Sequence, residues 1–189
     1  MITALVGAHG TGKTTVFKVI KERHPDWLYF TEGVRHQVPA FGYESPYEIV
    51  DEIGIGAFEL MNVNSWSVID PGVNTLLRGD ESIITDRSVV DNFAYYLTLR
   101  QEPFEGEQLL RNMATHYASL VDTFVYFPIG IFPLIGDSMR PQDEEYQRRH
   151  DANIKIAFQE LGVPQEKIHM LEAISVEARV KEILVRLLK

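Results

Sequence analysis

The chain has 189 residues, 45% of them hydrophobic, which is enough for one compact domain with a substantial core. Its formal net charge of −9 argues against a broad nucleic-acid-binding surface, which needs clustered lysine and arginine, and favours a small-molecule substrate. Cysteine is absent, which excludes disulfides and thiolate chemistry, and no apolar run reaches the ~20 residues of a membrane-spanning helix, so we expect a cytoplasmic protein.

The first predicted elements are a strand over residues 2–6 and a helix over residues 15–21, joined by the turn GAHGTGKT. The turn matches the pattern G-x-x-x-x-G-K-[ST], and the flanking strand and helix are the context that such a phosphate-binding loop requires. Glycines let backbone N–H groups point at a phosphate, and the helix N-terminus adds donors. The expected phosphate-binding residues are Gly7, His9, Gly10, Thr11, Gly12, Lys13, Thr14 and Thr15.

Within this loop, Lys13 brings a full positive charge to the β- and γ-phosphates, and the Thr14 hydroxyl is placed to ligate Mg²⁺. The strand follows the first residue directly, which leaves no room for a signal peptide before it. A glycine-rich turn without a ligand is the alternative interpretation.

A second strand is predicted over residues 27–31, with Glu32 and Arg35 beyond its carboxyl end. Ligands of parallel α/β sheets bind at that edge, so both charged residues are candidates for an acceptor site. A solvated loop that carries two opposite charges is the alternative.

The next segment is expected to begin as a loop over residues 37–45 and to continue as a helix over residues 47–70, with a break near Gly54. One or two further helical turns are predicted over residues 73–77. Trp66 is a candidate for a substrate pocket, although a large aromatic side chain at helical spacing more often belongs to a core.

A third buried strand over residues 82–85 ends on Asp86 and Arg87. An acidic residue at such a strand tip can hold Mg²⁺ beside a phosphate-binding loop. The arginine next to it suits an enzyme that holds a second anionic or hydroxylated substrate. Alternatively, Asp86 or Ser88 is the N-cap of the following helix.

That helix begins near residue 89 and carries Asp91 and Tyr95, four residues apart, as candidates that face the site; a solvated acid and a core tyrosine are the alternatives. A further helix over residues 106–120 and a strand over residues 123–127 follow.

Residues 128–141 are too irregular for a helix or strand, and a helix is predicted over residues 142–161. Arg140, Arg148 and Arg149 make this region a candidate lid that stabilises a transferring phosphoryl group. Alternatively, the last two arginines form i,i+4 pairs with glutamates on a solvated helix.

A fifth strand over residues 167–171 and a last helix capped by Ser175 complete the pattern. Five strands alternating with helices predict an α/β fold with three layers, in which a five-stranded parallel sheet has helices on both faces. We expect a single domain over residues 1–189.

Three segments together resemble the small P-loop nucleoside and nucleotide kinases, namely GAHGTGKTT, TDRSVVDNFAYY and MRPQDEEYQRR. Thymidylate kinases carry an Asp-Arg pair and then an Ala-Tyr pair at the spacing of Asp86, Arg87, Ala94 and Tyr95. Deoxynucleoside kinases carry an acidic-Arg-Ser triplet, and ribosylnicotinamide kinases a Glu and an Arg three apart, as in Glu32 and Arg35. The glycine-rich run that follows strand two in thymidylate kinases is missing here.

The resemblance implies that the loop binds ATP as phosphoryl donor and that Thr14 and Asp86 organise Mg²⁺. Arg87 and Arg35 would fix the acceptor, within a region of about residues 32–80. Glu32 would be a general base or a hydrogen-bond anchor, and arginines of a lid over about residues 130–150 would close over the transfer. Kinases of this type are often homodimers.

The leading hypothesis is a kinase that moves the γ-phosphoryl group of ATP to a nucleoside monophosphate, with a deoxynucleotide favoured. A (deoxy)nucleoside or ribosylnicotinamide kinase is the nearest alternative. From other classes, a polynucleotide kinase and an ATP-binding regulatory protein remain open, and the net charge of −9 counts against the first.

Overall fold

A five-stranded parallel sheet forms the centre of the computed structural model, which describes residues 1–31, 33–134 and 143–187, without the side chains of residues 35 and 36. The strand order is β2-β3-β1-β4-β5. The strands are β1 (Ile2–Val6), β2 (Leu28–Thr31), β3 (Ile83–Asp86), β4 (Thr123–Tyr126) and β5 (Ile168–Met170). The predicted α/β class with five parallel strands is therefore confirmed.

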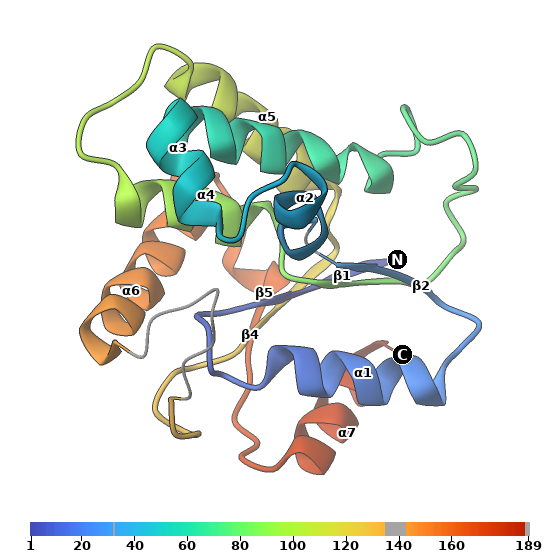
Figure 1. The fold of residues 1–189 in the computed structure, drawn as a ribbon. Helices are drawn as coiled ribbons and strands as arrows, with labels where there is room; N and C mark the ends of the chain where they lie inside the picture. Colours follow the sequence, from blue (N-terminus) through green and yellow to red (C-terminus); the bar gives the residue numbers. More distant parts are fainter. Residues whose placement is uncertain (32, 135–142, 188–189) are drawn as a thin grey trace.

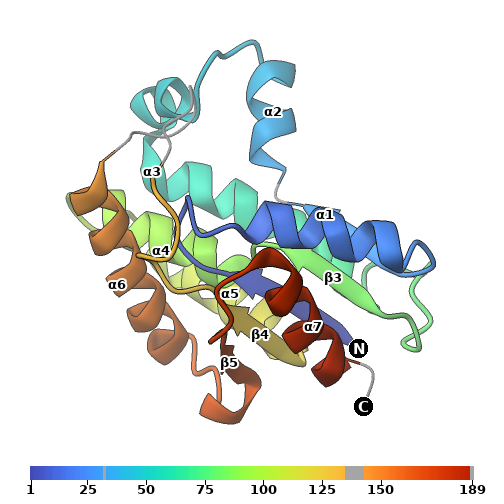
Figure 2. The same ribbon diagram turned by 90° about the horizontal axis from the view of Figure 1, so that it is seen from below.

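Helices cover both faces of this sheet (Figures 1 and 2). On one face lie α1 (Lys13–Arg23) and α7 (Val176–Leu187). On the other lie α3 (Pro46–Ser65), α4 (Val89–Leu99), α5 (Glu107–Leu120) and α6 (Glu144–Glu160), with α2 (Val34–Ala40) beside α3. Two single 3₁₀ turns, η1 (Trp66–Ile69) and η2 (Gln165–Lys167), complete the described elements.

The apolar core is divided by the sheet into two clusters. Leu5 of β1 packs with Val16 and Ile20 of α1 and with Val180 and Ile183 of α7. Alternate β1 residues face the other cluster, because successive strand side chains point to opposite sides. Since β1 is buried along its whole length, its continuous apolar run is the one that a central parallel strand requires.

Strand register brings separate parts of the chain to one edge of the sheet. Asp86, the last residue of β3, lies opposite Leu5 in β1 and Thr31 in β2. The residues that follow these three strands therefore start from the same edge, where the sequence predicts the site. No helix in the described ranges has the length and apolar character needed to cross a bilayer.

Two local predictions were wrong, and one was confirmed. Residues 37–40 of the predicted loop over residues 37–45 belong to helix α2, because Val38 is buried against Ile49 and Phe58, and this packing outweighs Pro39 inside the helix. Residues 73–77 form turns instead of a helix. The break near Gly54 is present, with φ 80° and ψ 152° inside α3.

The turns over residues 73–77 have a local cause. The Asn74 side chain donates to the Val68 carbonyl at 2.8 Å and accepts from the Leu76 amide at 3.2 Å. Asparagine side chains that bond nearby backbone groups in this way compete with helix formation.

Candidate functional site

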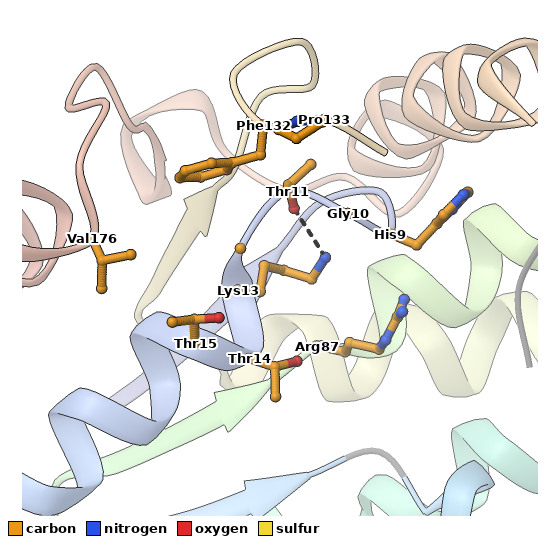
Figure 3. A pocket seen from close by; sticks show the side chains of 11 residues that line it. His9, Gly10, Thr11, Lys13, Thr14, Thr15, Arg87, Phe132, Pro133 and Val176 are labelled. Carbon is orange, nitrogen blue, oxygen red and sulfur yellow. Dashed lines mark hydrogen bonds between the residues drawn. The ribbon is translucent and has the colours of Figure 1, made fainter. Parts of the chain in front are cut away.

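The loop between β1 and α1 lies at the point where the strand order reverses. From β1 the sheet continues through β3 on one side and through β4 on the other. Open α/β sheets bind ligands at such a point, beyond the carboxyl ends of the strands. A pocket of about 310 Å³ is found there, lined by residues 9–15, Arg87, Phe132, Pro133 and Val176 (Figure 3). Of the predicted phosphate-binding residues, all but Gly7 line this pocket.

The curl of the loop depends on glycine at two positions. Gly10 has φ +75° and Gly12 has φ +86°, both in the left-handed region. A Cβ on Gly10 would approach Leu134 Cδ1 to 2.8 Å, and one on Gly12 would approach Phe132 Cε2 to 3.0 Å. Both glycines therefore have a left-handed backbone conformation, and the loop packs tightly against the segment after β4.

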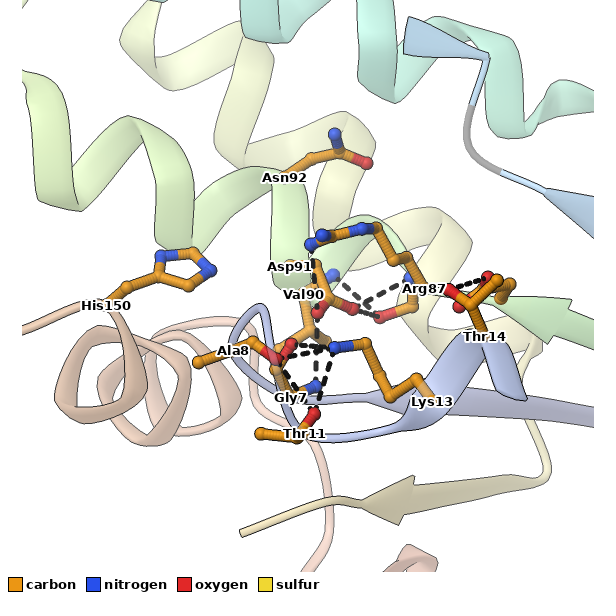
Figure 4. A network of polar contacts seen from close by, with 12 residues as sticks. Gly7, Ala8, Thr11, Lys13, Thr14, Arg87, Val90, Asp91, Asn92 and His150 are labelled. Atoms are coloured by element: carbon orange, nitrogen blue, oxygen red, sulfur yellow. Dashed lines mark hydrogen bonds and ion pairs between the residues drawn. The ribbon is translucent and has the colours of Figure 1, made fainter. Parts of the chain in front are cut away.

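The Lys13 ammonium lies inside the concave side of the loop (Figure 4). Its Nζ donates to the carbonyl oxygens of Gly7 and Ala8, the second at 2.8 Å, and to Thr11 Oγ1 at 3.3 Å. The side chain is 5% exposed, so the charge is held within the loop. A phosphate that enters the loop would meet this ammonium together with the N-terminus of α1.

Two side-chain oxygens lie side by side where the start of α1 meets the end of β3. Thr14 Oγ1 donates to Asp86 Oδ2 at 2.7 Å. Asp86 Oδ1 is buried and has no hydrogen-bond partner among the described residues. Hydroxyl and carboxylate oxygens beside a phosphate site are the donor set that Mg²⁺ prefers, and an unpaired buried carboxylate oxygen needs a partner. These residues therefore fit the expected metal.

Asp91 lies beneath the loop and is fully buried. Its Oδ1 accepts from the Gly7 amide at 3.2 Å, and its Oδ2 accepts from the Ser88 amide at 2.9 Å, closing a capping box at the start of α4. Burial raises the pKa of Asp91, while Arg87, Lys13 and the two amides oppose that rise. This carboxylate therefore links the loop to the start of α4, and its predicted contact with an acceptor stays a prediction.

Arg87 has an unusual backbone conformation. With φ 83° it is the one non-glycine residue in the left-handed region within the described ranges. Its carbonyl accepts from Thr85 Oγ1 at 2.7 Å and its amide donates to the Leu5 carbonyl at 3.0 Å, which hold this conformation. Its guanidinium lies 3.9 Å from Asp91 Oδ1 and 5.2 Å from the centre of the Tyr95 ring. Strain of this kind concentrates at functional sites.

Helix α6 is attached to the site through aromatic and polar contacts. The Tyr95 ring stacks on His150 with centres 4.0 Å apart, and His150 Nδ1 lies 3.2 Å from Thr98 Oγ1. Gln147 Nε2 donates to the His9 carbonyl at 2.6 Å. The predicted residues Arg87 and Tyr95 are therefore in contact with each other and, through α6, with the phosphate loop.

A buried polar network between α3 and α4 was not predicted. Glu59, 3% exposed, accepts from Asn92 Nδ2 at 3.0 Å and from Asn62 Nδ2 at 3.3 Å. Asn92 Oδ1 in turn accepts from Trp66 Nε1 at 2.7 Å. Trp66, 3% exposed, lies in the core, as the alternative interpretation of its helical spacing expected. Asn92 follows two buried valines by two and three positions, and this was the available sequence signal.

The remaining predicted residues divide into two groups. Glu32, Arg140 and the Arg35 side chain lie outside the described residues. The Arg148 side chain is 63% exposed and lies 3.3 Å from Glu144, as expected for an i,i+4 pair on a solvated helix. The guanidinium of Arg149 lies 5.7 Å from the centre of the Tyr146 ring.

Arg179 on α7 is a buried part of the site that the sequence analysis missed. Its Nη1 donates to the Thr11 carbonyl at 2.6 Å and its Nε donates to the Ala173 carbonyl at 2.8 Å. The side chain is fully buried, and burial lowers its pKa. Its position on the apolar stripe of α7, between Val176 and Val180, was the signal for burial.

Comparisons with known proteins place this site in context. The model of the AAA_28 family, an AAA domain, matches residues 3–179. No curated protein was matched. Deoxyadenosine kinase from M. mycoides with bound dATP is similar at 16% identity and a TM-score of 0.66, over 100% of both chains.

Two further solved structures resemble the chain. Thymidylate kinase from Candida albicans has 15% identity and a TM-score of 0.60, over 98% of this chain and 90% of that one. NadR in complex with NAD and AMP-PNP has 16% identity and a TM-score of 0.66, over 96% of this chain and 48% of NadR. At such identities the likeness shows a shared fold, and it confirms the expected resemblance to P-loop kinases.

Proposed function

The chain belongs to the AAA_28 family of AAA domains, and on that premise we propose that it transfers the γ-phosphoryl group of ATP to a nucleoside monophosphate. The observation that carries this proposal is the contact of Thr14 with Asp86 at 2.7 Å, at the mouth of a glycine-rich loop that holds Lys13 inside it. Phosphoryl transfer is catalysed mainly by positioning the reactants and by stabilising the charge that develops. It therefore needs a loop that binds the anion, oxygen atoms that bind the metal, and an arginine close to both.

On the donor side, residues 9–15 would surround the triphosphate, with Lys13 near its β- and γ-phosphates. Thr14 and Asp86 would hold Mg²⁺, which neutralises charge that develops on the transferring group. Lys13 now bonds the Gly7 and Ala8 carbonyls, and a bound phosphate would offer its ammonium a stronger, charged partner.

On the acceptor side, Arg87 reaches the same pocket from the strand next to the loop. Its guanidinium can contact an acceptor phosphate while Tyr95, on which it lies, keeps it oriented. Glu32, as base or hydrogen-bond anchor, and Arg35, as a second cation, belong to the same proposal because they follow β2 at the same sheet edge.

A nucleoside is the second candidate for the acceptor, favoured by one specific observation. Arg87 lies 3.9 Å from the buried carboxylate of Asp91, which offsets part of the positive charge that an acceptor phosphate would use. A hydroxyl group of an uncharged nucleoside needs less positive charge, so this pairing suits a nucleoside as well.

The test is ADP formation from ATP and Mg²⁺ in the presence of each nucleoside, deoxynucleoside, ribosylnicotinamide and monophosphate in turn. We expect ADP formation to depend on one class of acceptor, with the phosphorylated product identified by mass spectrometry. Strong stimulation by nucleosides alone would replace the monophosphate by the second candidate. ATP binding without stimulation by any small acceptor would contradict the proposal and favour a regulatory protein, and stimulation only by DNA would favour a polynucleotide kinase.

A further inference from the structure

The pocket extends past the phosphate loop to an end that is distant from Arg87. Figure 3 shows Val176 and Phe132 towards one end of the pocket, and Arg87 towards the other. Under the proposed function, the terminal phosphate and the acceptor meet near Thr14 and Arg87. The nucleoside part of the donor therefore extends in the opposite direction, towards Phe132 and Val176.

The ring of Phe132 is in contact with the guanidinium of Arg179. The guanidinium carbon lies 4.8 Å from the centre of the Phe132 ring and 5.4 Å from that of Phe127. Arg179 is itself fixed by its hydrogen bonds to the carbonyls of Thr11 and Ala173. One face of the Phe132 ring is thus supported by a buried cation, and the half-buried ring lines the pocket.

In the loop after β5, polar backbone groups form hydrogen bonds with other residues of the protein. Glu182 accepts from the Ala173 amide at 3.0 Å and from the Glu172 amide at 3.4 Å, while the Ala173 carbonyl accepts from Arg179. Although burial acts to raise it, these amides and His169 hold the pKa of Glu182 below its usual range, so the carboxylate is ionised at neutral pH. Breaking such bonds would leave partly buried charges unpaired.

Selection of one nucleobase over another requires donors and acceptors that pair with the base edge, because every base offers a similar flat face. At this end of the pocket, among the described residues, Phe132 and Val176 offer apolar surface, while the amides of Glu172 and Ala173 and the Ala173 carbonyl are already hydrogen-bonded within the protein. A base can therefore bind here by stacking, which tolerates any base.

We propose that the donor base stacks on Phe132, with Arg179 as its support, and that the donor site accepts purine and pyrimidine nucleoside triphosphates with similar affinity. This inference rests on the proposed function, because it takes the pocket to be the donor site. Phe132 is then the residue that binds the base. The loop after β5 does not discriminate between bases, because its polar backbone groups are bonded within the protein.

The experiment is calorimetric titration of the full chain, with Mg²⁺ and no acceptor, with the β,γ-imido analogues of ATP, GTP, CTP and UTP and with inorganic tripolyphosphate. We expect the four analogues to bind with dissociation constants within about tenfold of one another. Phe132→Ala should weaken all four by about 5- to 150-fold, the range of base–aromatic stacking, and leave tripolyphosphate within about threefold. Phe132→Tyr should retain the affinities.

Leu109→Ala is the matched control, since Leu109 is a large apolar residue, 52% exposed, on α5 away from the pocket. Thermal unfolding of each variant checks that it is folded. An ATP analogue that binds more than about 30-fold tighter than the other three would overturn the inference while leaving the proposed function intact. The inference would also be overturned if Phe132→Ala weakened the binding of tripolyphosphate as much as the binding of the nucleotides. Failure of all five probes to bind the wild type would overturn the proposed function itself.

Discussion

Thr14 donates a 2.7 Å hydrogen bond to Asp86, although 72 positions separate the two residues in the chain. The contact forms because β3 lies next to β1, so that the loop after one strand meets the last residue of the other. It joins the only two residues that the sequence analysis assigned to a metal, and it leaves Asp86 Oδ1 buried without a partner among the described residues.

Asp86→Asn should raise the Mg²⁺ concentration needed for half-maximal ATP binding by about 10- to 100-fold, because the amide keeps the shape but loses the charge that attracts the ion. The measurement is ATP binding at a series of Mg²⁺ concentrations. Asp80→Asn, at an exposed position before β3, is the control and should change nothing. An unaltered Mg²⁺ dependence in Asp86→Asn would remove this residue from the metal site.

The left-handed backbone of Arg87 predicts that two truncations differ in stability. Arg87→Gly and Arg87→Ala both lose the contacts of the guanidinium with Asp91 and Tyr95. Glycine adopts φ 83° without the steric cost that alanine pays, so Arg87→Gly should have a free energy of unfolding about 1 kcal/mol higher than Arg87→Ala.

Urea unfolding of the two variants gives this difference directly. Both should have lost acceptor-stimulated activity to a similar extent, because neither has the guanidinium. Equal stabilities, or a less stable glycine variant, would mean that the backbone at this position is not strained.

The variant Trp66→Phe tests whether Trp66 acts in the core or in a substrate pocket. The change leaves Asn92 Oδ1 buried without its indole donor, so the free energy of unfolding should fall by about 1–3 kcal/mol. The KM of the acceptor should stay near the wild-type value. Trp27→Phe, at the other tryptophan, is the control for a partly buried position. A raised KM with unchanged stability would return Trp66 to the substrate pocket.

Glu107 predicts a pH-dependent contribution to stability. A hydrogen bond from Tyr96 at 2.6 Å, aided by Arg100 at 2.9 Å, holds the pKa of this carboxyl below 4.5, its ordinary value. The ionised form therefore stabilises the folded state above pH 4.5, and this contribution is lost as the pH falls through the lowered pKa.

Glu107→Gln should lower the free energy of unfolding by about 1 kcal/mol at pH 7, a modest value because the pair is partly solvated. The difference from wild type should shrink when unfolding is measured at successively lower pH below 4.5. Glu105→Gln, at an exposed position two residues earlier, is the matched control. A difference that is constant with pH would show that the charge of Glu107 is not what stabilises the fold.

The sequence predicts those parts of the site that depend on neighbours in the chain. The phosphate loop is one local motif, and Asp86 is found by its place at the end of an apolar run. Arg179 could not be assigned in this way, since its partner Thr11 lies 168 positions away and only the packing of α7 against α1 brings them together. Glu59 and Asn92 were missed for the same reason, because 33 positions separate these two network partners.

Helix α2 shows that local sequence signals can also mispredict secondary structure. Its proline and the glycine that follows it at residue 42 are local signals for a loop, and they are outweighed by burial of Val38 against α3. For Trp66, one sequence pattern fits both a core position and a pocket position. Only the structure shows that its indole donates to Asn92 within the core.

The most direct test of nucleotide binding by the loop after β1 is a crystal structure of the chain with Mg²⁺ and AMP-PNP. We expect the triphosphate to lie within residues 7–14, Lys13 Nζ to have moved from the Gly7 and Ala8 carbonyls to phosphate oxygens, and Thr14 and Asp86 to flank the metal. A fully occupied nucleotide bound elsewhere, with the Thr14–Asp86 hydrogen bond and the Lys13 contacts unchanged, would contradict this expectation.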